Sequence, residues 1–541
     1  MKKIVNYLIY IICVMFLSSC NDFLSTFPKD ALSPSTTWKT EEDAQKFLIG
    51  CYNGWLWGEE FFYLDCASDI GFSFHTHEGW RVIGDGSMHS GNSGYSFYAF
   101  GTIRRCDNFL DNIDRVEFKD EATKKDMIAQ VKIIRAYQYF KMNWWYGGVP
   151  IIPLSSSASE AQVPRDTEAN VKKHVYDEID AALLDIKNAP KARGYVAKGT
   201  ALALKMRSAL YYEDYQRALD AAKAIVALNQ YELESNFSHL FSLAGRNSKE
   251  IILSVQKLKP NANEWFITVP NNLDGGWSSM VPTQNLIDMY EMANGLTKEE
   301  EGSGYDPAHP FKGRDPRMAV TVLVPGIDWN SKCYQNILNT LDVNLPNGTK
   351  NANYPAAANN ASKTGLTWAK YLLPLEQYEG VLDPTETQYI VYRYAEVLLS
   401  LAEASNELNG PSDEVYNALD EVRNRVNMPN VDRTKYETKE KLRGLIRRER
   451  TIELAGEGHR RADILRWKDS SGKMIAETVL NGALNRVTGT IRYDETDEFK
   501  RAEITGVEKI EDRKFAVYNR YLPIPQTSLD RNPQLKQNSG Y

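Results

Sequence analysis

The stretch GTALALKMRSALYYEDYQRALDAAKAIVALN, residues 199–229, decides the fold. Its apolar residues recur at helical spacing on both sides of a short polar elbow, Glu213–Tyr215. The apolar stripes comprise Ala203, Met206 and Leu210 in the first half, and Ala218, Ala221, Ala222 and Ile225 in the second. Because small alanines let two helices approach closely, the stretch predicts an antiparallel pair of the tetratricopeptide-like kind.

A second helix pair is predicted far downstream, where RYAEVLLSLAEASNELNG (393–410) precedes another amphipathic segment. Gly410 and Pro411 separate its two helices. The stripes are Tyr394, Val397, Leu398 and Leu401, then Val415, Ala418, Leu419 and Val422. Helix pairs of this kind bury their apolar faces only by stacking on neighbours, so we expect a mostly α-helical scaffold.

Other parts of the chain extend this scaffold or interrupt it. Thr40 and Asp43 have the spacing of a capping box, and a long helix is predicted over 121–146, ended by Gly147. A shorter helix is expected in PTQNLIDMYEMANG (282–295), and the proline-rich tail 521–541 should lie extended. The scaffold is assigned mainly to 20–56, 103–234 and 386–541, and loop-rich parts to 57–102 and 235–385.

The N-terminus MKKIVNYLIYIICVMFLSSCND has the pattern of an export signal. Lys2 and Lys3 precede an apolar run to Leu17, which is shorter than the ~20 residues that cross a bilayer. Leu-Ser-Ser before Cys20 resembles the lipobox of bacterial lipoproteins, in which the cysteine is acylated and becomes the mature N-terminus. We therefore expect a signal peptide over 1–19 and lipidation of Cys20; the alternative is an ordinary signal peptide with a chance cysteine.

Composition narrows the class of protein further. The net charge is −7, from 64 basic and 71 acidic residues, which does not indicate a nucleic-acid partner. No second segment has transmembrane length. The four remaining cysteines contain no CxxC pair, so a zinc site is not indicated, whereas a disulfide and buried free thiols both stay open. They are Cys51, Cys66, Cys106 and Cys333.

Aromatic residues are abundant, with 11 Trp and 30 Tyr, and two irregular segments combine them with polar groups. Flat aromatic rings suit the CH faces of sugars, and charged or amide groups suit their hydroxyls. The first segment, HTHEGWRV (75–82), and the residues after it provide Trp80, Arg81 and Tyr95. The second, EWFITVPNNLDGGWSS (264–279), provides Trp265 and Trp277, with the turn at Asp274–Gly276 projecting Trp277 outward. The alternative for each aromatic residue is packing within the core.

Two other residue clusters could suggest a metal site or a catalytic site, but in each a simpler interpretation is favoured. His75, His77 and His89 could suggest a metal site, yet they are interpreted as polar loop residues, and no metal or cofactor is predicted. Glu449 and Glu453 lie one helical turn apart, and Glu449 continues an inward-facing apolar stripe. We predict a buried ion-pair network with nearby arginines, not a glycosidase pair. Its other members are Arg450, Arg460 and Arg461, and Arg393, Glu396 and Glu403 are interpreted in the same way.

Several motifs together resemble the SusD/RagB family of outer-membrane nutrient-binding lipoproteins. The most specific are LIRRERTIELAGEGHRRADILRW (445–467) and the ending YLPIPQTSLDRNPQLKQNSGY (521–541). One departure is Ser539, where the family usually has proline. The other matching pieces are the lipobox at Cys20, EDAQKFLIGCYNGW (42–55), RAYQYFKMNWWYGGVPIIP (135–153), the pair at 199–229, PTQNLIDMYEMANG (282–295), DPRM (315–318) and RYAEVLLSLAEA (393–404).

The resemblance implies a mostly α fold in which tetratricopeptide-like helix pairs form one side and an irregular sub-domain carries the ligand surface. It further implies a lipid-anchored protein on the outer face of the outer membrane, which captures oligosaccharide for a SusC-like TonB-dependent transporter and is not an enzyme. Three alternatives remain: a RagB-like peptide-binding import protein, a surface hydrolase, and a tetratricopeptide adaptor that holds only other proteins.

Overall fold

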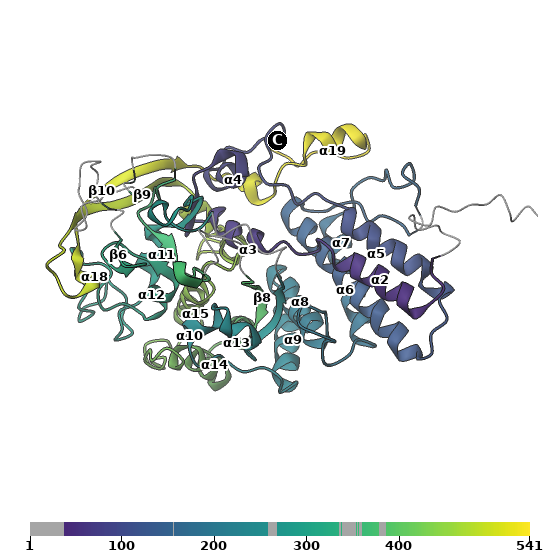
Figure 1. Cartoon of the computed structure of the whole chain (residues 1–541), viewed down its shortest axis with the longest axis horizontal. Coiled ribbons are helices and arrows are strands. Elements are labelled where there is room, and N and C mark those ends of the chain that lie inside the picture. Colours follow the sequence, from purple (N-terminus) through teal and green to yellow (C-terminus); the bar gives the residue numbers. More distant parts are fainter. Residues whose placement is uncertain are drawn as a thin grey trace, which may run out of the picture.

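The computed structural model describes residues 37–154, 156–257, 268–334, 337, 353, 355, 360–377 and 386–541. Figure 1 shows an elongated, mostly helical molecule with a helical bundle at one end and a mixed region carrying a long β-hairpin at the other. The bundle end contains α2 (Glu41–Tyr52), α5 (Gly101–Asn112), α6 (Glu121–Tyr146) and α7 (Glu168–Leu183).

The helix ends in the bundle follow the predicted capping signals. The Asp43 backbone N–H donates to the Thr40 hydroxyl at 3.2 Å, and the Thr40 N–H donates to the Asp43 carboxylate at 3.1 Å. This reciprocal pair is the capping box predicted for α2. The long helix α6 runs from Glu121 to Tyr146, as predicted, and ends where Gly147 adopts the left-handed conformation with φ of 67°.

Both predicted helix pairs are present, and they stack on each other. The first pair is α8 (Lys198–Tyr211) with α9 (Tyr215–Ala227), and the second is α13 (Tyr394–Asn409) with α14 (Asp413–Asn424). Every residue of the predicted apolar stripes is buried. Since α13 packs against α9 as well as α14, segments far apart in the sequence form one continuous stack. The mostly α fold with tetratricopeptide-like helix pairs is thereby confirmed.

A buried ion-pair network fixes α15 (Lys439–Glu453) in the centre of the molecule. Arg317 lies 2.9 Å from Glu449 and 3.2 Å from Glu453, and Arg393 lies 2.6 Å from Glu453. Burial alone would raise the pKa of Glu453, but Arg425, Arg393 and Arg317 together hold it well below its ordinary value. The predicted network exists, although its strongest partners come from outside the helix.

The remaining predicted members also make scaffold contacts. Arg450 pairs with Asp463 at 2.8 Å, and Arg460 pairs with Asp69 at 2.8 Å. Arg461 instead donates to two backbone carbonyls, those of Ala67 and Asn519. The other two predicted carboxylates are also paired: Glu396 with Arg207, and Glu403 with Arg466.

The structure differs from the sequence expectation in several places. A helix, α3 (Gly58–Cys66), lies inside the segment expected to be loop, and the helix expected over 282–295 is only α11 (Gln284–Met289). The tail contains a short helix, α19 (Gln526–Arg531). The largest difference is the hairpin of β9 (Gly482–Ile491) and β10 (Ala502–Arg513), within a part expected to be helical.

The other strands form short antiparallel pairs. They are β1 (Gly71–Ser73) with β3 (Met280–Pro282), β2 (Ile251–Val255) with β8 (Tyr389–Arg393), β4 (Val322–Leu323) with β7 (Thr367–Trp368), and β5 (Asp328–Trp329) with β6 (Lys332–Cys333). The remaining helices are η2 (Thr76–Glu78), α4 (Trp80–Asp85), η3 (Ile113–Arg115), α10 (Phe237–Leu240), η4 (Ala244–Asn247), η6 (Asn272–Asp274), α12 (Arg317–Thr321), η7 (Leu375–Gln377), α16 (Arg460–Arg466), α17 (Ala476–Val479), α18 (Glu498–Arg501) and η8 (Val517–Arg520).

The four cysteines whose disulfide state the sequence did not decide are free thiols. Cys51, Cys66 and Cys106 are buried, and Cys333 is half-buried. Within the described ranges, no helix combines the length and apolar character needed to cross a membrane. The expected signal peptide, Cys20 and Trp265 lie outside the described residues.

Candidate functional site

The pairing of β1 with β3 brings together the two aromatic segments that are far apart in the sequence. Phe72 pairs with Val281, and Ser73 pairs with Met280. The ladder continues beyond β1, because the Phe74 N–H donates to the Ser279 carbonyl at 3.2 Å. The 75–82 segment and the turn that carries Trp277 therefore leave the same end of this small sheet.

Trp277 stands on a rigid turn and is 41% exposed, in accord with the outward projection predicted for it. Gly275 has a φ of 87°, which favours glycine. A Cβ on Gly276 would lie 2.2 Å from the Pro270 carbonyl oxygen, so that position also requires glycine. The buried Asp274 carboxylate accepts hydrogen bonds from the side chains of Asn271 at 2.8 Å and Asn330 at 2.9 Å, which fixes the turn against its neighbours.

Trp80 lies in the core, unlike Trp277. It is only 2% exposed, because its ring is stacked between Tyr63, at 5.7 Å, and Tyr95, at 4.4 Å. Tyr95 is half-buried and forms the outer layer of this stack. The ring of Trp80 therefore has no free face for a sugar, and direct contact with a ligand, as predicted from the sequence, does not fit its position.

Arg81 connects the first aromatic segment to the β9–β10 hairpin. Its Nε lies 3.2 Å from the Glu511 carboxylate, and its Nη1 donates to the Phe74 carbonyl at 3.4 Å. The guanidinium also lies 5.7 Å from the ring centroid of Phe72. Arg81 is thus partly engaged in structure, and 28% of its side chain stays accessible beside Phe74.

Sequence reasoning missed several polar groups of this region. The Lys363 ammonium lies 4.6 Å from the centroid of the Phe74 ring, and the Arg486 guanidinium donates to the Lys363 carbonyl. Arg486 in turn pairs with the exposed Glu508 at 2.7 Å. The charged residues along β9 and β10 are a signal that could have indicated Arg486 and Glu508, since charges on a strand indicate an exposed or polar face. Nothing near Lys363 in the sequence indicated its position.

We call this region the aromatic surface and define it as Phe74, His75, Arg81, Trp277 and Lys363. It combines the exposed indole of Trp277 with the half-buried phenyl ring of Phe74, and the Arg81 and Lys363 cations and the His75 ring lie close to that phenyl ring. Such a surface can stack on the apolar face of a ring and donate hydrogen bonds to oxygen atoms. The rings of His75 and His77 lie 5.5 Å apart, but no group of three or more metal-ligating side chains occurs in the described parts of the chain.

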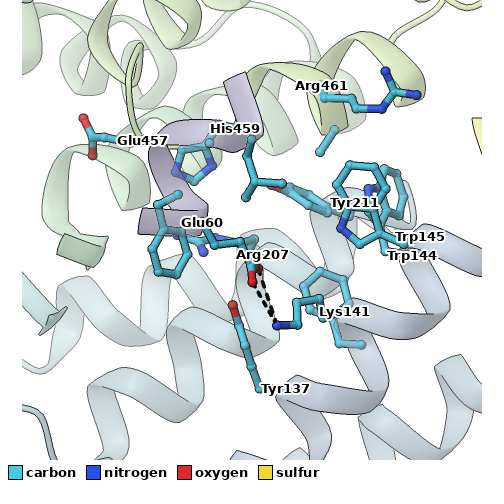
Figure 2. A pocket seen from close by; sticks show the side chains of 15 residues that line it. Glu60, Tyr137, Lys141, Trp144, Trp145, Arg207, Tyr211, Glu457, His459 and Arg461 are labelled. Carbon is cyan, nitrogen blue, oxygen red and sulfur yellow. Dashed lines mark hydrogen bonds and ion pairs between the residues drawn. The ribbon is translucent and has the colours of Figure 1, made fainter. Parts of the chain in front are cut away.

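Figure 2 shows a pocket between α3, α6, α8 and the segment before α16, which is lined mainly by apolar side chains. Its cavity of about 60 Å³ has room for only a few waters and is far below the ~300 Å³ at which small-molecule sites begin. Burial raises the pKa of Glu60, which Lys141 contacts at 3.4 Å. This pocket is therefore too small for a sugar ring, and the aromatic surface remains the candidate site.

Comparison with known proteins gives the family. The family model described as the SusD family matches residues 234–541, which is more than half of the chain. This chain therefore belongs to the SusD family.

Known relatives align with this chain over most of its length. SusD-like protein P25 of Formosa agariphila is 24% identical over 502 residues, covering 86% of this chain and 90% of the relative. A SusD-like carbohydrate-binding protein from Bacteroides fragilis has a similar structure, with a TM-score of 0.78, 25% identity, and coverage of 92% of this chain and 99% of the other. A laminarin-binding SusD-like protein has a TM-score of 0.70 at 20% identity, with 93% and 100% coverage.

Proposed function

We propose that this protein captures an oligosaccharide at the aromatic surface and delivers it, without chemical change, to a SusC-like TonB-dependent outer-membrane transporter. The observation that carries the proposal is the exposed indole of Trp277, held on a rigid turn two residues before Ser279, whose carbonyl accepts a hydrogen bond from the Phe74 N–H. A related structure named as a carbohydrate-binding protein supports the ligand class.

The proposed binding uses two kinds of contact. A pyranose ring presents axial C–H groups on one face, which pack against an indole, while its hydroxyls need donors and acceptors around the rim. Lys363 and His75 lie beside Phe74 and provide such groups. Because the backbone turn that carries Trp277 is already fixed, little conformational entropy of the loop is lost on binding.

Binding without catalysis fits the positions of the carboxylates that the sequence offered for a hydrolase. Glu449 and Glu453 are both fully buried and paired with arginines, so they cannot reach a substrate at the surface. A glycosidase needs two carboxyl groups ~5–10 Å apart across an open cleft.

The proposal also includes the location of the protein. Lipidation of Cys20 would anchor the chain on the outer face of the outer membrane, where a nutrient-binding protein meets its ligand before the transporter does. Several acyl chains on one cysteine give a stable anchor, since each buried CH₂ contributes ~0.8 kcal/mol.

The test is isothermal titration of the purified protein against panels of oligosaccharides and oligopeptides. We expect heat with at least one oligosaccharide and recovery of that ligand intact after long incubation. Binding only to peptides would replace the proposal with the RagB-like alternative, and cleavage of the ligand would replace it with a hydrolase. If neither panel gives heat of binding, an adaptor that holds only other proteins would be favoured.

A further inference from the structure

A second and larger cavity lies where the C-terminal ends of α6 and α8 meet the first turn of α7 and η8. Its volume of about 350 Å³ falls within the ~300–1,000 Å³ range of small-molecule sites. None of its lining residues belongs to the aromatic surface. They are Trp144, Glu168, Ala169, Lys172, Tyr211, Tyr212, Glu213, Leu465, Arg466, Arg520 and Tyr521, and we call this cavity the Arg520 pocket.

Two cations of this pocket are held in place by aromatic rings. The Arg520 guanidinium lies 3.7 Å from the centroid of the Trp144 ring and 4.8 Å from that of Tyr521. The Lys172 ammonium lies 5.3 Å from the ring centroid of Tyr212. Such contacts orient a cation without neutralising its charge. Neither Arg520 nor Lys172 makes an ion pair with any carboxylate of the described residues.

The two carboxylates that line the Arg520 pocket, those of Glu168 and Glu213, each already contact a hydrogen-bond donor. Glu168 accepts a hydrogen bond from the Tyr521 hydroxyl at 2.7 Å, and Glu213 pairs with Lys468 at 3.1 Å. The third cation, Arg466, is paired with Glu403 and Asp463. Among the described residues that line the pocket, Arg520 and Lys172 are therefore the cations without a paired carboxylate, and Glu168 keeps its negative charge beside Tyr521.

Arg520 also has hydrogen-bonding capacity left for a ligand. Its Nη1 donates to the Trp144 carbonyl at 2.9 Å, which leaves other N–H groups of the planar guanidinium unused within the described structure. Burial lowers the pKa of Arg520 from its ordinary value, so the charged guanidinium would be stabilised by an anionic partner. The start of α7 at Glu168 adds the partial positive charge of a helix N-terminus to this wall.

We propose that the Arg520 pocket is a second ligand site, which binds the carboxylate or sulfate group of a small anionic molecule. Arg520 would donate hydrogen bonds to two oxygen atoms of the anion, and Lys172 would supply a second charge. Cations occupy faces of Trp144 and Tyr212, so stacking of a neutral sugar on these faces is disfavoured. The site is separate from the aromatic surface and does not depend on the proposed function.

Isothermal titration of the mature protein with sodium D-glucuronate, D-glucose 6-sulfate and D-glucose tests this proposal. We expect one or both anions to bind and D-glucose to bind at least about tenfold more weakly, because D-glucose offers no charged oxygen atoms to Arg520 and Lys172. The two anions distinguish carboxylate from sulfate recognition. No heat with either anion, or equal affinity for D-glucose, overturns the proposal.

A matched pair of variants places the anion. Lys172→Gln should weaken anion binding by about tenfold. Lys173→Gln removes the same charge from the next residue, whose exposed side chain pairs with Asp177 at 2.6 Å, and should leave the affinity unchanged. Trp277→Ala should also have no effect, which separates this site from the aromatic surface. Equal loss in Lys172→Gln and Lys173→Gln, or no loss in Lys172→Gln, contradicts the assignment.

Discussion

Arg81 Nε lies 3.2 Å from a carboxylate oxygen of Glu511, so the first aromatic segment is tied directly to the β9–β10 hairpin near the end of the chain. Glu511 also accepts from Arg513 Nε at 3.0 Å, and Arg513 donates to the carbonyls of Ser68 and Gly71. The hairpin therefore braces β1 from outside, and β1 in turn positions the turn that carries Trp277.

The Arg81–Glu511 pair should couple these two elements energetically. We expect a double-mutant cycle with Arg81→Ala and Glu511→Ala to give a coupling of about 1 kcal/mol, because the pair is only partly exposed. Urea unfolding of the four proteins measures it. Strictly additive single losses would show that the hairpin and the segment are held together by other contacts.

Trp277→Ala should weaken oligosaccharide binding by between about twofold and tenfold, the value expected for the loss of one stacking ring. The fold should be unaffected, because the indole is exposed. Titration calorimetry measures the affinity, and thermal unfolding measures the stability. Trp57→Ala is the matched control, since Trp57 is 58% exposed but lies at the start of α3. Equal effects of both substitutions would place the binding site elsewhere.

The stability of the protein should fall in acid because buried carboxylates are held ionised by arginines. Burial would raise the pKa of Glu403, but Arg466 and its neighbours lower it from 4.5 to about 2. A depressed pKa means that the stabilisation is complete above the unfolded value of 4.5 and is lost as the pH falls through about 2. The pKa of Glu449 is also lowered, by Arg317 and Arg423 against the effect of burial.

Urea unfolding between about pH 7 and pH 2 measures this loss. Glu403→Gln should lower the stability at neutral pH and flatten the acid dependence, since Gln cannot titrate. A wild-type unfolding midpoint that stays constant across this range would refute the role of the network.

Cys20→Ala should release the protein from the membrane fraction, because the acylated side chain would be absent. Cell fractionation and immunoblotting detect the change, and Cys13→Ala, which alters a cysteine inside the expected signal peptide, is the control. Normal anchoring of Cys20→Ala at the cell surface would rule out lipidation at this residue.

The sequence predicted the helical scaffold well because its signals are local. The capping box at Thr40, the glycine after Tyr146 and the alanine-rich stripe of α9 act within a few residues. The helix α3 was missed because its stretch, GEEFFYLDC, has no clean helical period and its N-cap, Trp57, makes no side-chain capping bond. The β9–β10 hairpin was missed because its two bulges interrupt the alternation that identifies strands.

The candidate site was harder to predict because long-range packing decides exposure. Trp80 and Trp277 both follow a glycine, yet one is buried and the other exposed. Trp80 is covered by Tyr63 of α3, which the sequence did not identify as a helix. Lys363 reaches Phe74 from a segment with no sequence feature that links the two.

The turn at Gly276 has a consequence for how the ligand preference proposed for this protein could change. A side chain at Gly276 would collide with the Pro270 carbonyl, and the buried Asp274 anchors the same loop, so the backbone shape is set independently of residue 277. We expect that position 277 tolerates exchange of its side chain without loss of the loop. A new ligand preference could then arise through single codon changes at position 277, while the rest of the fold stays unchanged.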